Sequence, residues 1–455
     1  MEVFTVPIEG KYLLYRPLRR LAFVGNGAMA DLTMEIVRSG DGRGAAEERH
    51  RSLKSREATR FLKSIGFLEL DPPAPPPPEV AYRPTAATLL LTSRCNLRCT
   101  YCYASGGERP VQDLSPALAR SAVDEAHRNA VEQGQPRFEL IFHGGGEPVQ
   151  AWDVVQEAVA YARAKELPCR TSMVSNGVWS PAQRDWLLQN MDGIGISFDG
   201  AADTQNGQRP LAGGRGSFES VMRTIEALDK ANFPYGIRMT ALAPWRDRLP
   251  RDVAFLCEET SSPSIQVEPA FNSDRGEYRG PTQAEAEAFV EAFMEAFEIA
   301  GRAGRQLIFS GARPWLITQS FCRAPYAVLI VNPAGELVGC FEVTDKSHPL
   351  ASISRVGSLN GDGVVLDVPS RAALHEMLER RRSACRDCFC YWHCAGDCFS
   401  RVFAPGDTGP PGSSPRCFMN QEITAHLLLW HIRNSGGVWR GQGGHPQGAE
   451  LMKAF

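Results

Sequence analysis

Short apolar runs and longer helical patterns alternate through the middle of the chain. The runs of strand length are Ala87–Thr92, Phe138–His143, Thr171–Ser175, Ile194–Phe198, Ile237–Leu242 and Ile265–Glu268. Apolar residues at helical spacing fill Pro116–Val131, Trp152–Ala164, Pro181–Gln189 and Phe218–Ala231, and Ala284–Arg302 follows the last run. Six such repeats predict an α/β fold with a parallel sheet, most simply a partial (β/α)6 barrel of the TIM type. Active residues are then expected at the C-terminal ends of the strands.

Different patterns flank this barrel. Three short β-prone runs and two helical patterns precede it, at Val3–Val6, Tyr12–Tyr15, Leu21–Val24, Ala30–Val37 and Arg56–Ile65. This order predicts a winged-helix-like module. A proline-rich run at 71–78 predicts a stiff extended spacer. We therefore expect a module at 1–70, a linker at 71–83, the barrel at 84–310, a cysteine-rich domain at 311–420, and a helix (Gln421–Arg433) with a tail at 421–455.

Composition restricts the class of protein. The 455 residues are too many for one ordinary core, and the balance of 43% hydrophobic to 22% charged residues is that of a globular chain. A net charge of -3 gives no reason to expect a nucleic-acid or membrane partner. The chain has no apolar run long enough for a membrane span, and its first residues do not resemble a signal peptide. We expect a cytoplasmic protein.

The 13 cysteines are the unusual feature of the composition. Without a secretion signal, they predict metal ligation rather than disulfides. Ten fall into two spaced groups, whereas Cys169, Cys257 and Cys390 lie outside both patterns. Cys169 and Cys257 are expected to be buried thiols without a function.

The first group is Cys95-x3-Cys99-x2-Cys102, directly after the first predicted barrel strand. Three thiolates can hold one face of an iron–sulfur cubane, one ligand short of the usual four, which leaves an iron open to a small molecule. The alternative is a zinc knuckle completed by His143.

Polar residues follow the next three predicted strands. They are Gly144-Gly145-Gly146-Glu147-Pro148, Ser175-Asn176-Gly177 and Ser197-Phe198-Asp199-Gly200. Glycines admit a ligand close to the backbone, and a carboxylate can pair with an ammonium group. Hydroxyls, amides and carboxylates together on one rim suit a ribose and a zwitterion.

These motifs resemble the radical SAM superfamily over residues 86–270. The resemblance implies a [4Fe-4S] cluster on Cys95, Cys99 and Cys102 whose open iron is chelated by S-adenosylmethionine (SAM). It also implies one-electron cleavage of SAM to a 5′-deoxyadenosyl radical. The positions that it assigns to SAM contacts are Tyr101 near the adenine, Gly145, Gly146 and Glu147 at the methionine, Ser175 at the ribose, and Asp199 and Arg209.

The second group resembles the SPASM domain, an auxiliary-cluster extension of radical SAM enzymes. Its spacing is Cys322-x12-Gly335-x4-Cys340, then Cys385-x2-Cys388-x5-Cys394-x3-Cys398, then Cys417. The resemblance implies one auxiliary [4Fe-4S] cluster on Cys385, Cys388, Cys394 and Cys417, and a second on Cys322, Cys340 and Cys398, so three clusters in all. An upstream cysteine that completes the second site in some members is missing from Arg313–Gln319, and that cluster is expected to have an open iron unless Cys390 fills it. The alternative is a pair of zinc ribbons, which would need eight ligands.

The same resemblance extends to enzymes that mature ribosomally made (RiPP) peptides. The N-terminal module resembles their leader-peptide recognition element, and an exposed edge strand could bind a leader by β-addition. Residues 1–70 hold 12 Lys and Arg against 9 Asp and Glu, which does not favour DNA binding. A purely structural cap is the other interpretation of this module.

The sequence therefore predicts an oxidoreductase that crosslinks side chains of a precursor peptide through a carbon–carbon or thioether bond, supplied with electrons by a flavodoxin or ferredoxin. The alternatives are a sulfatase-maturase-like oxidation of a Cys or Ser side chain, and a non-catalytic metal-cluster scaffold that only binds peptide.

Overall fold

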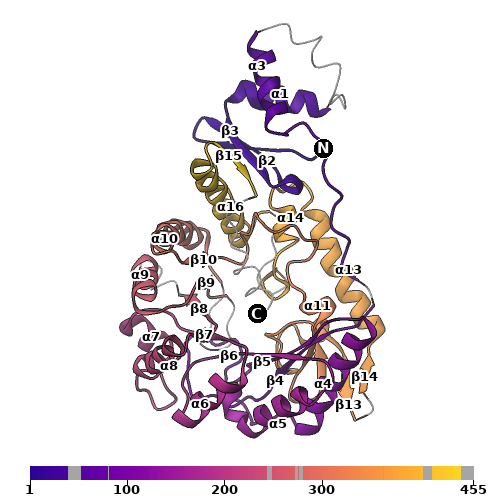
Figure 1. Ribbon diagram of the computed structural model, residues 1–455, viewed down its shortest axis with the longest axis vertical. Coiled ribbons are helices and arrows are strands. Elements are labelled where there is room, and N and C mark those ends of the chain that lie inside the picture. The colour runs from indigo at the N-terminus through magenta and orange to yellow at the C-terminus, as the bar shows by residue number, and fades with distance from the viewer. Residues whose placement is uncertain are drawn as a thin grey trace.

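The computed structural model describes residues 1–38, 53–79, 81–242, 248–271, 275, 280–361, 363–402 and 412–441. Most of the predicted C-terminal tail lies outside these ranges. Figure 1 shows the N-terminal module at one end of the molecule, the barrel-like part at the other, and the cysteine-rich part along one side. None of the described helices has the length and apolar character needed to cross a membrane.

A sheet of eleven strands forms the centre of the molecule, in the order β10-β9-β8-β7-β6-β5-β4-β11-β12-β13-β14. All neighbours from β10 to β11 pair in parallel. The predicted runs correspond to β4 (Ala86–Leu90), β5 (Phe138–His143), β6 (Cys169–Ser175), β7 (Gly193–Ser197), β8 (Tyr235–Ala241) and β9 (Ser264–Pro269), and β10 (Gln306–Ile308) follows them. The predicted α/β class with a mostly parallel sheet is confirmed, and it is consistent with a partial TIM-type barrel.

Helices cover the outer face of this sheet (Figure 1). They are α4 (Pro116–Glu132), α5 (Trp152–Arg163), α6 (Pro181–Asn190), α7 (Ala202–Gln208), α8 (Phe218–Lys230), α9 (Leu249–Glu259) and α10 (Gln283–Arg302). Their starts follow from capping: Ser115 accepts a hydrogen bond from Leu118 N at 3.2 Å, and Ser180 and Thr282 form capping boxes with Gln183 and Glu285. The sequence analysis did not predict α9.

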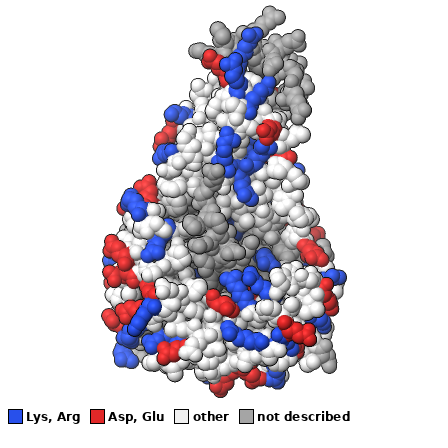
Figure 2. Space-filling view, viewed as in Figure 1, with Lys and Arg blue, Asp and Glu red and all other residues white. Residues whose placement is uncertain are grey.

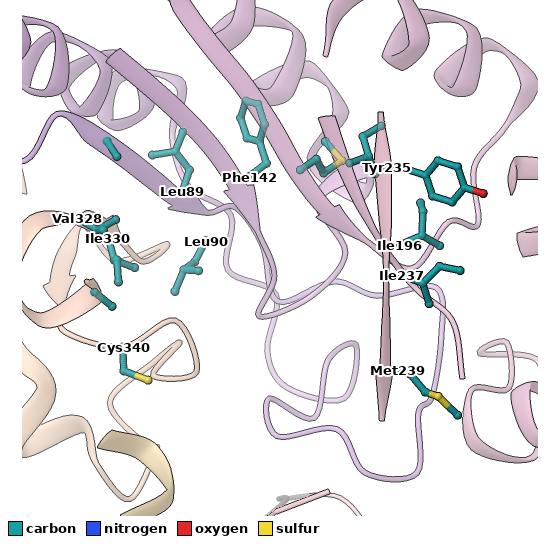
Figure 3. Packing of buried hydrophobic residues seen from close by; sticks show 14 of the residues in the cluster. Leu89, Leu90, Phe142, Ile196, Tyr235, Ile237, Met239, Val328, Ile330 and Cys340 are labelled. Carbon is teal, nitrogen blue, oxygen red and sulfur yellow. The ribbon is translucent and has the colours of Figure 1, made fainter. Parts of the chain in front are cut away.

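The main core lies between the sheet and these helices. All five residues of β4 are buried, as expected for a parallel strand covered on both faces. Figure 3 shows Leu89 and Leu90 of β4 on the same side of the view as Val328 and Ile330, with Cys340 just beyond. These residues belong to one hydrophobic cluster. The core of the barrel therefore continues into the cysteine-rich part.

The cysteine-rich part extends the central sheet. Its first strand, β11 (Leu329–Val331), pairs in parallel with β4, and β12 (Glu336–Val338), β13 (Arg355–Asn360) and β14 (Gly363–Leu366) continue antiparallel. Its helices are α11 (Ala324–Ala327), α12 (Ala351–Ser354), α13 (Val368–Ala384), α14 (Tyr391–Cys394) and α15 (Phe399–Val402). The sequence analysis did not predict α13, which has 17 residues.

The N-terminal module contains a four-stranded antiparallel sheet in the order β1-β2-β3-β15. Its first three strands and its helices match the predicted runs: β1 (Phe4–Ile8), β2 (Lys11–Arg16), β3 (Leu21–Gly25), α1 (Gly27–Arg38) and α3 (Leu53–Ser64), with a 3-10 turn η1 (Pro17–Arg19). The fourth strand, β15 (Val438–Arg440), comes from the C-terminal segment after α16 (Pro415–Asn434). That helix begins at Pro415 rather than at Gln421. The winged-helix interpretation stays a prediction.

Candidate functional site

The loop that carries Cys95, Cys99 and Cys102 leaves the C-terminal end of β4 and is held by the backbone that follows α7. Arg98 N donates to Pro210 O at 2.8 Å, and Thr100 N donates to Gln208 O at 2.9 Å. These bonds run between two segments more than one hundred positions apart. The loop conformation is therefore set by the fold and not only by what the cysteines bind.

Each of the three thiols receives a hydrogen-bond donor from the chain. Leu97 N reaches Cys95 Sγ and Gly106 N reaches Cys102 Sγ, both at 3.4 Å, and Arg209 Nη1 lies 3.9 Å from Cys99 Sγ. Such donors stabilise thiolates and tune iron–sulfur clusters. Burial acts the other way and is the largest cause of the raised pKa values, about 12 for Cys95 and about 11 for Cys99. Bound iron would supply positive charge that offsets the effect of burial on the thiolates. The three thiols and their hydrogen-bond donors therefore fit an iron–sulfur cluster.

The zinc alternative would need the same thiols to converge with His143. His143 instead stacks on Phe341, with ring centroids 5.3 Å apart. Burial lowers its pKa to about 4. This arrangement does not favour a mononuclear zinc site.

The glycine turn after β5 packs directly on the cysteine loop. Gly146 N donates to Thr92 O at 2.6 Å, and Glu147 N donates to Arg94 O at 2.8 Å. A Cβ atom on Gly146 would collide with the carbonyl of Arg94, and one on Gly145 would lie 2.9 Å from Thr344 Cγ2. The glycines are required because the backbone of the cysteine loop and the cysteine-rich part approach them closely.

Glu147 is 3% exposed and joins two strand ends. Its carboxylate accepts hydrogen bonds from Ser175 Oγ at 2.6 Å and from Asn176 N at 2.8 Å. Burial raises its pKa to about 7, and these bonds limit the rise. The Ser175 hydroxyl also accepts from Trp179 Nε1 at 2.8 Å and from Gly177 N at 3.2 Å. The predicted ribose-binding hydroxyl is thus engaged within the protein.

Asp199 is the centre of a second polar network, and its side chain is fully buried. Its Oδ2 accepts from Tyr101 Oη at 2.6 Å and from Arg209 Nε at 2.9 Å, and Gln208 Nε2 donates to the same atom at 2.7 Å. Its Oδ1 accepts from Thr240 N at 2.9 Å. The structure therefore brings together Asp199, Arg209 and Tyr101, and their assignment to SAM contacts stays a prediction.

Arg209 connects this network to the cysteine loop. Its guanidinium lies over the Tyr101 ring, 5.2 Å from the centroid. Burial works against the charge of Arg209, but Asp199 beside it raises the pKa above its usual value. A permanent cation therefore lies next to Cys99.

Two arginines at this site were missed by the sequence analysis. Arg98 donates to the carbonyls of Cys95, Leu97 and Gly107, at 3.0, 2.8 and 2.9 Å. Arg275 donates to the carbonyls of Cys99 and Gly106, both at 3.0 Å. Arg98 has a sequence signal, since it lies inside the cysteine motif. Arg275 has none, because it approaches from a distant segment.

The four cysteines Cys385, Cys388, Cys394 and Cys417 gather where three helices meet. Cys385 follows α13, Cys394 ends α14, and Cys417 lies in the first turn of α16, where Cys417 N donates to Ser414 Oγ at 3.2 Å. Asn420 Nδ2 points to Cys394 Sγ at 3.5 Å. Burial raises the pKa values of Cys385 and Cys394, and the thiols of Cys388 and Cys417 raise both further, which indicates that the four lie near one another.

Cys322, Cys340 and Cys398 form another group. Burial is the largest cause that raises the pKa values of Cys322 and Cys340, and the thiol of Cys398 raises both further. Ala324 N donates to Cys322 Sγ at 3.3 Å, and Ser400 Oγ lies 3.4 Å from Cys398 Sγ. Residues 313–319, where the sequence lacks the upstream cysteine, begin with Arg313. Arg313 Nη2 donates to Phe321 O and to His393 O, both at 3.2 Å.

Cys390 does not lie with this open group. It is 1% exposed in a cluster with residues of the N-terminal sheet and α16, and its thiol donates to Asn420 O at 3.7 Å. Its hydrogen bond to Cys388 lowers the pKa of Cys388 to about 7. This position does not favour Cys390 as a further ligand of the group formed by Cys322, Cys340 and Cys398.

Four polar side chains interact around Tyr103, which is close to the first cysteine group and to Cys340. The thiolates of Cys102 and Cys340 each raise the pKa of Tyr103, after the larger effects of burial and of Glu342. Arg238 on β8 and Glu342 act on Tyr103, and both also act on His143. We call this set, Tyr103, His143, Arg238 and Glu342, the inter-cysteine residues.

Comparisons with known proteins agree with this geometry. Residues 89–254 match the family model of the Radical SAM superfamily. The chain is 30% identical over 163 residues to the sporulation killing factor maturation protein SkfB of Bacillus subtilis, covering 35% of this chain and 36% of that protein. It is 25% identical over 154 residues to the cysteine-type anaerobic sulfatase-maturating enzyme of Clostridium novyi, covering 32% and 40%. The matched regions therefore span well under half of either relative.

A solved structure shows the fold over a longer range. SuiB of Streptococcus suis, crystallised with its precursor peptide SuiA, superposes with a TM-score of 0.52 at 14% identity. The superposition covers 91% of this chain and 96% of that one. At this identity the likeness is one of fold.

Proposed function

The chain carries a radical SAM domain, and we propose that it is a radical SAM/SPASM peptide maturase that oxidatively crosslinks side chains of a ribosomally made precursor peptide. The proposal assigns a SAM-binding [4Fe-4S] cluster to Cys95, Cys99 and Cys102. It assigns auxiliary clusters to the two downstream cysteine groups. When bound, SAM and its cluster supply a 5′-deoxyadenosyl radical that can remove hydrogen from an unactivated carbon.

The observation that carries the proposal is the position of the inter-cysteine residues. Cys102 of the SAM-type loop and Cys340 of the downstream group are both close enough to Tyr103 to raise its pKa. A substrate side chain beside Tyr103 would be close to both groups. Radical generation and removal of the remaining electron need this arrangement, and a scaffold that only binds peptide does not.

The chain's own residues would mainly orient SAM and keep water out. Glu147 offers its carboxylate to an ammonium group while Ser175 and Asn176 fix its position. Asp199 and Arg209 fix Tyr101 beside the cysteine loop, where an adenine could pack. Ser175 then acts through Glu147 and not directly on the ribose.

Two similar proteins, SkfB and SuiB, support the proposal of a peptide partner. SkfB is a maturation protein, and SuiB has been crystallised with a precursor peptide. We extend this to the N-terminal module as the place where a leader peptide binds. The electron donor of the proposal is a flavodoxin or ferredoxin.

Anaerobic reconstitution tests the enzymatic part. The wild-type protein should hold about 12 irons, the content of three four-iron clusters. It should also release 5′-deoxyadenosine from SAM under reduction. Replacing Cys95, Cys99 and Cys102 together by Ala should abolish this release while the downstream iron remains. A colourless zinc-loaded protein, or release that survives the triple replacement, would contradict the proposal.

The match to a sulfatase-maturating enzyme supports a second candidate, oxidation of one Cys or Ser side chain. Fragmentation of the product distinguishes the two candidates. A crosslink removes two hydrogens from two different residues, whereas the alternative leaves an aldehyde on one residue. An aldehyde that reacts with a hydrazine probe would favour the alternative.

A further inference from the structure

Two neighbouring hollows lie along the proline-rich segment 72–78, and neither is lined by residues of the proposed SAM site. The first has a volume of about 690 Å³ and is lined by Leu18, Arg19, Arg20, Leu70, Pro73 and Arg440 among others. The second, of about 390 Å³, is lined among others by Arg83, Gln133, Gln319, Arg323 and Tyr326. Both include Pro75 and Ile317. The two hollows are therefore adjacent, and we call them together the linker groove.

The walls of the linker groove are fixed by contacts on either side. Arg16, fully buried beneath the N-terminal sheet, pairs with Asp71 at 2.5 Å at the start of the proline-rich segment. Further along, Gln319 Nε2 donates to Pro75 O. Prolines between these points restrict the backbone. A ligand would meet a largely preformed surface and lose less entropy on binding.

The lining is basic with exposed apolar surface. The lining arginines are Arg19, Arg20 and Arg440 in the first hollow and Arg83 and Arg323 in the second, and the one acidic lining residue is Glu79. Leu70 is 76% exposed. Figure 2 shows Lys and Arg side chains outnumbering Asp and Glu toward the N-terminal end of this view.

Three of these arginines are available to a ligand. The side chains of Arg20, Arg83 and Arg323 are exposed. Across the described ranges, the contacts found for them include no side-chain hydrogen bond or salt bridge. Arg19, by contrast, pairs with Glu69. Free guanidinium groups beside exposed aliphatic surface are complementary to the carboxylates of an extended acidic chain.

The edges of the N-terminal sheet are less suited to bind a peptide by strand addition. The outer edge of β3 is already paired with β15. The two outer strands are β15, which has only three residues, and β1, which contains Pro7 and so lacks one backbone donor. The linker groove has neither obstacle.

We propose that the linker groove binds an extended acidic and aliphatic segment of the precursor peptide. This inference rests on the proposed function, since it names the part of the peptide substrate that is recognised. One end of the groove touches η1 and β15 of the N-terminal module. Its other end reaches Arg323, next to Cys322 of the open cysteine group. A segment bound along it would lead from the module toward the downstream cysteines.

Fluorescence anisotropy with defined peptides tests the inference on the iron-loaded full-length protein. A fluorescein-labelled peptide of alternating Leu and Glu should bind, and the matching Leu and Lys peptide should not. The double variant Arg20→Glu/Arg323→Glu should weaken binding at least about tenfold, because two attractive charges become repulsive. Arg20→Gln/Arg323→Gln should give an intermediate loss. Arg302→Glu, an exposed site on α10, is the matched control and should bind like the wild type.

Several results would overturn the inference. The first is that the Leu and Lys peptide binds as well as the Leu and Glu peptide, and the second is that the double Glu variant binds like the wild type. The third is that a single-stranded DNA oligonucleotide displaces the Leu and Glu peptide equally well, which would show a surface for polyanions in general. Release of 5′-deoxyadenosine by the wild type without peptide is measured in parallel. If that activity is present but the acidic peptide fails to bind, only the groove is rejected. If the activity is absent, the proposed function fails on its own.

Discussion

Asp199 accepts four hydrogen bonds from four different residues while its side chain is fully buried. Glu147 is similarly engaged by Ser175 and Asn176. The sequence correctly marked these polar residues as a group at the strand ends, because parallel strands end on one rim. It could not indicate that they bond to one another, since those contacts depend on side-chain directions set by the whole fold.

Replacing Asp199 by Asn should destabilise the protein by about 3–5 kcal/mol, because Arg209 would keep a buried charge without its counter-ion. Thermal unfolding of the iron-loaded protein measures the loss. The double variant Asp199→Asn/Arg209→Gln removes both charges and should recover part of it. Equal stability of the single variant and the wild type would show that the pair does not hold the site together.

Glu147 should make SAM binding depend on pH. Burial raises its pKa to about 7, so the carboxylate that would attract an ammonium group forms only as the pH rises through that value. SAM should therefore bind about tenfold more tightly at pH 8 than at pH 6. A tenfold change in affinity corresponds to about 1.4 kcal/mol of binding free energy. Anaerobic calorimetric titration measures this.

In Glu147→Gln the affinity for SAM should be lower and nearly independent of pH in the same range. Glu157→Gln, on an exposed ion pair of α5, serves as the control and should keep the wild-type profile. A wild-type affinity that stays flat between pH 6 and pH 8 would show that Glu147 does not contact the ammonium group of SAM.

At the scale of elements, β15 was the least predictable feature. Val438, Trp439 and Arg440 carry no strand signal of their own, and their partner β3 lies more than four hundred positions earlier. By contrast, β4 to β9 were predicted because parallel strands covered on both faces read as continuous apolar runs. The three-residue strands β10, β11 and β12 were missed because a periodicity needs more residues than they contain.

Trp439→Ala should loosen the N-terminal module selectively. Trp439 is fully buried, with its ring 6.3 Å from Tyr15 and 5.8 Å from His431. Truncating a buried aromatic residue costs about 3–5 kcal/mol. Hydrogen exchange should show lost protection in β3 and in the C-terminal end of α16, with the strands β5 to β8 unchanged.

Trp439→Phe is the matched variant and should retain most of the protection in β3. If Trp439→Ala leaves that protection intact, β15 adds no stability to the sheet. If protection falls across the whole chain, the N-terminal module is not a separate unit of stability, and the predicted selective loss is wrong.

At the scale of the molecule, the central sheet runs from the barrel into the cysteine-rich part without a break. β11 pairs with β4, so residue 311 marks a change in composition and not an edge of the sheet. This continuity places β12, which Cys340 follows, next to β11, the partner of β4, and Cys340 is close enough to Tyr103 of the first cysteine loop to raise its pKa. The sequence predicted both groups from their spacing, but their proximity follows only from the three-dimensional pairing.

The most direct test of peptide maturation is mass spectrometry of small open reading frames from the gene's neighbourhood, each co-expressed with this protein. We predict that one peptide loses two hydrogens and yields fragments that show two side chains joined. The variant with Cys95, Cys99 and Cys102 replaced by Ala should leave that peptide unmodified. Peptides that are identical with the wild type and with the triple variant, under conditions where the wild type cleaves SAM, would contradict the account.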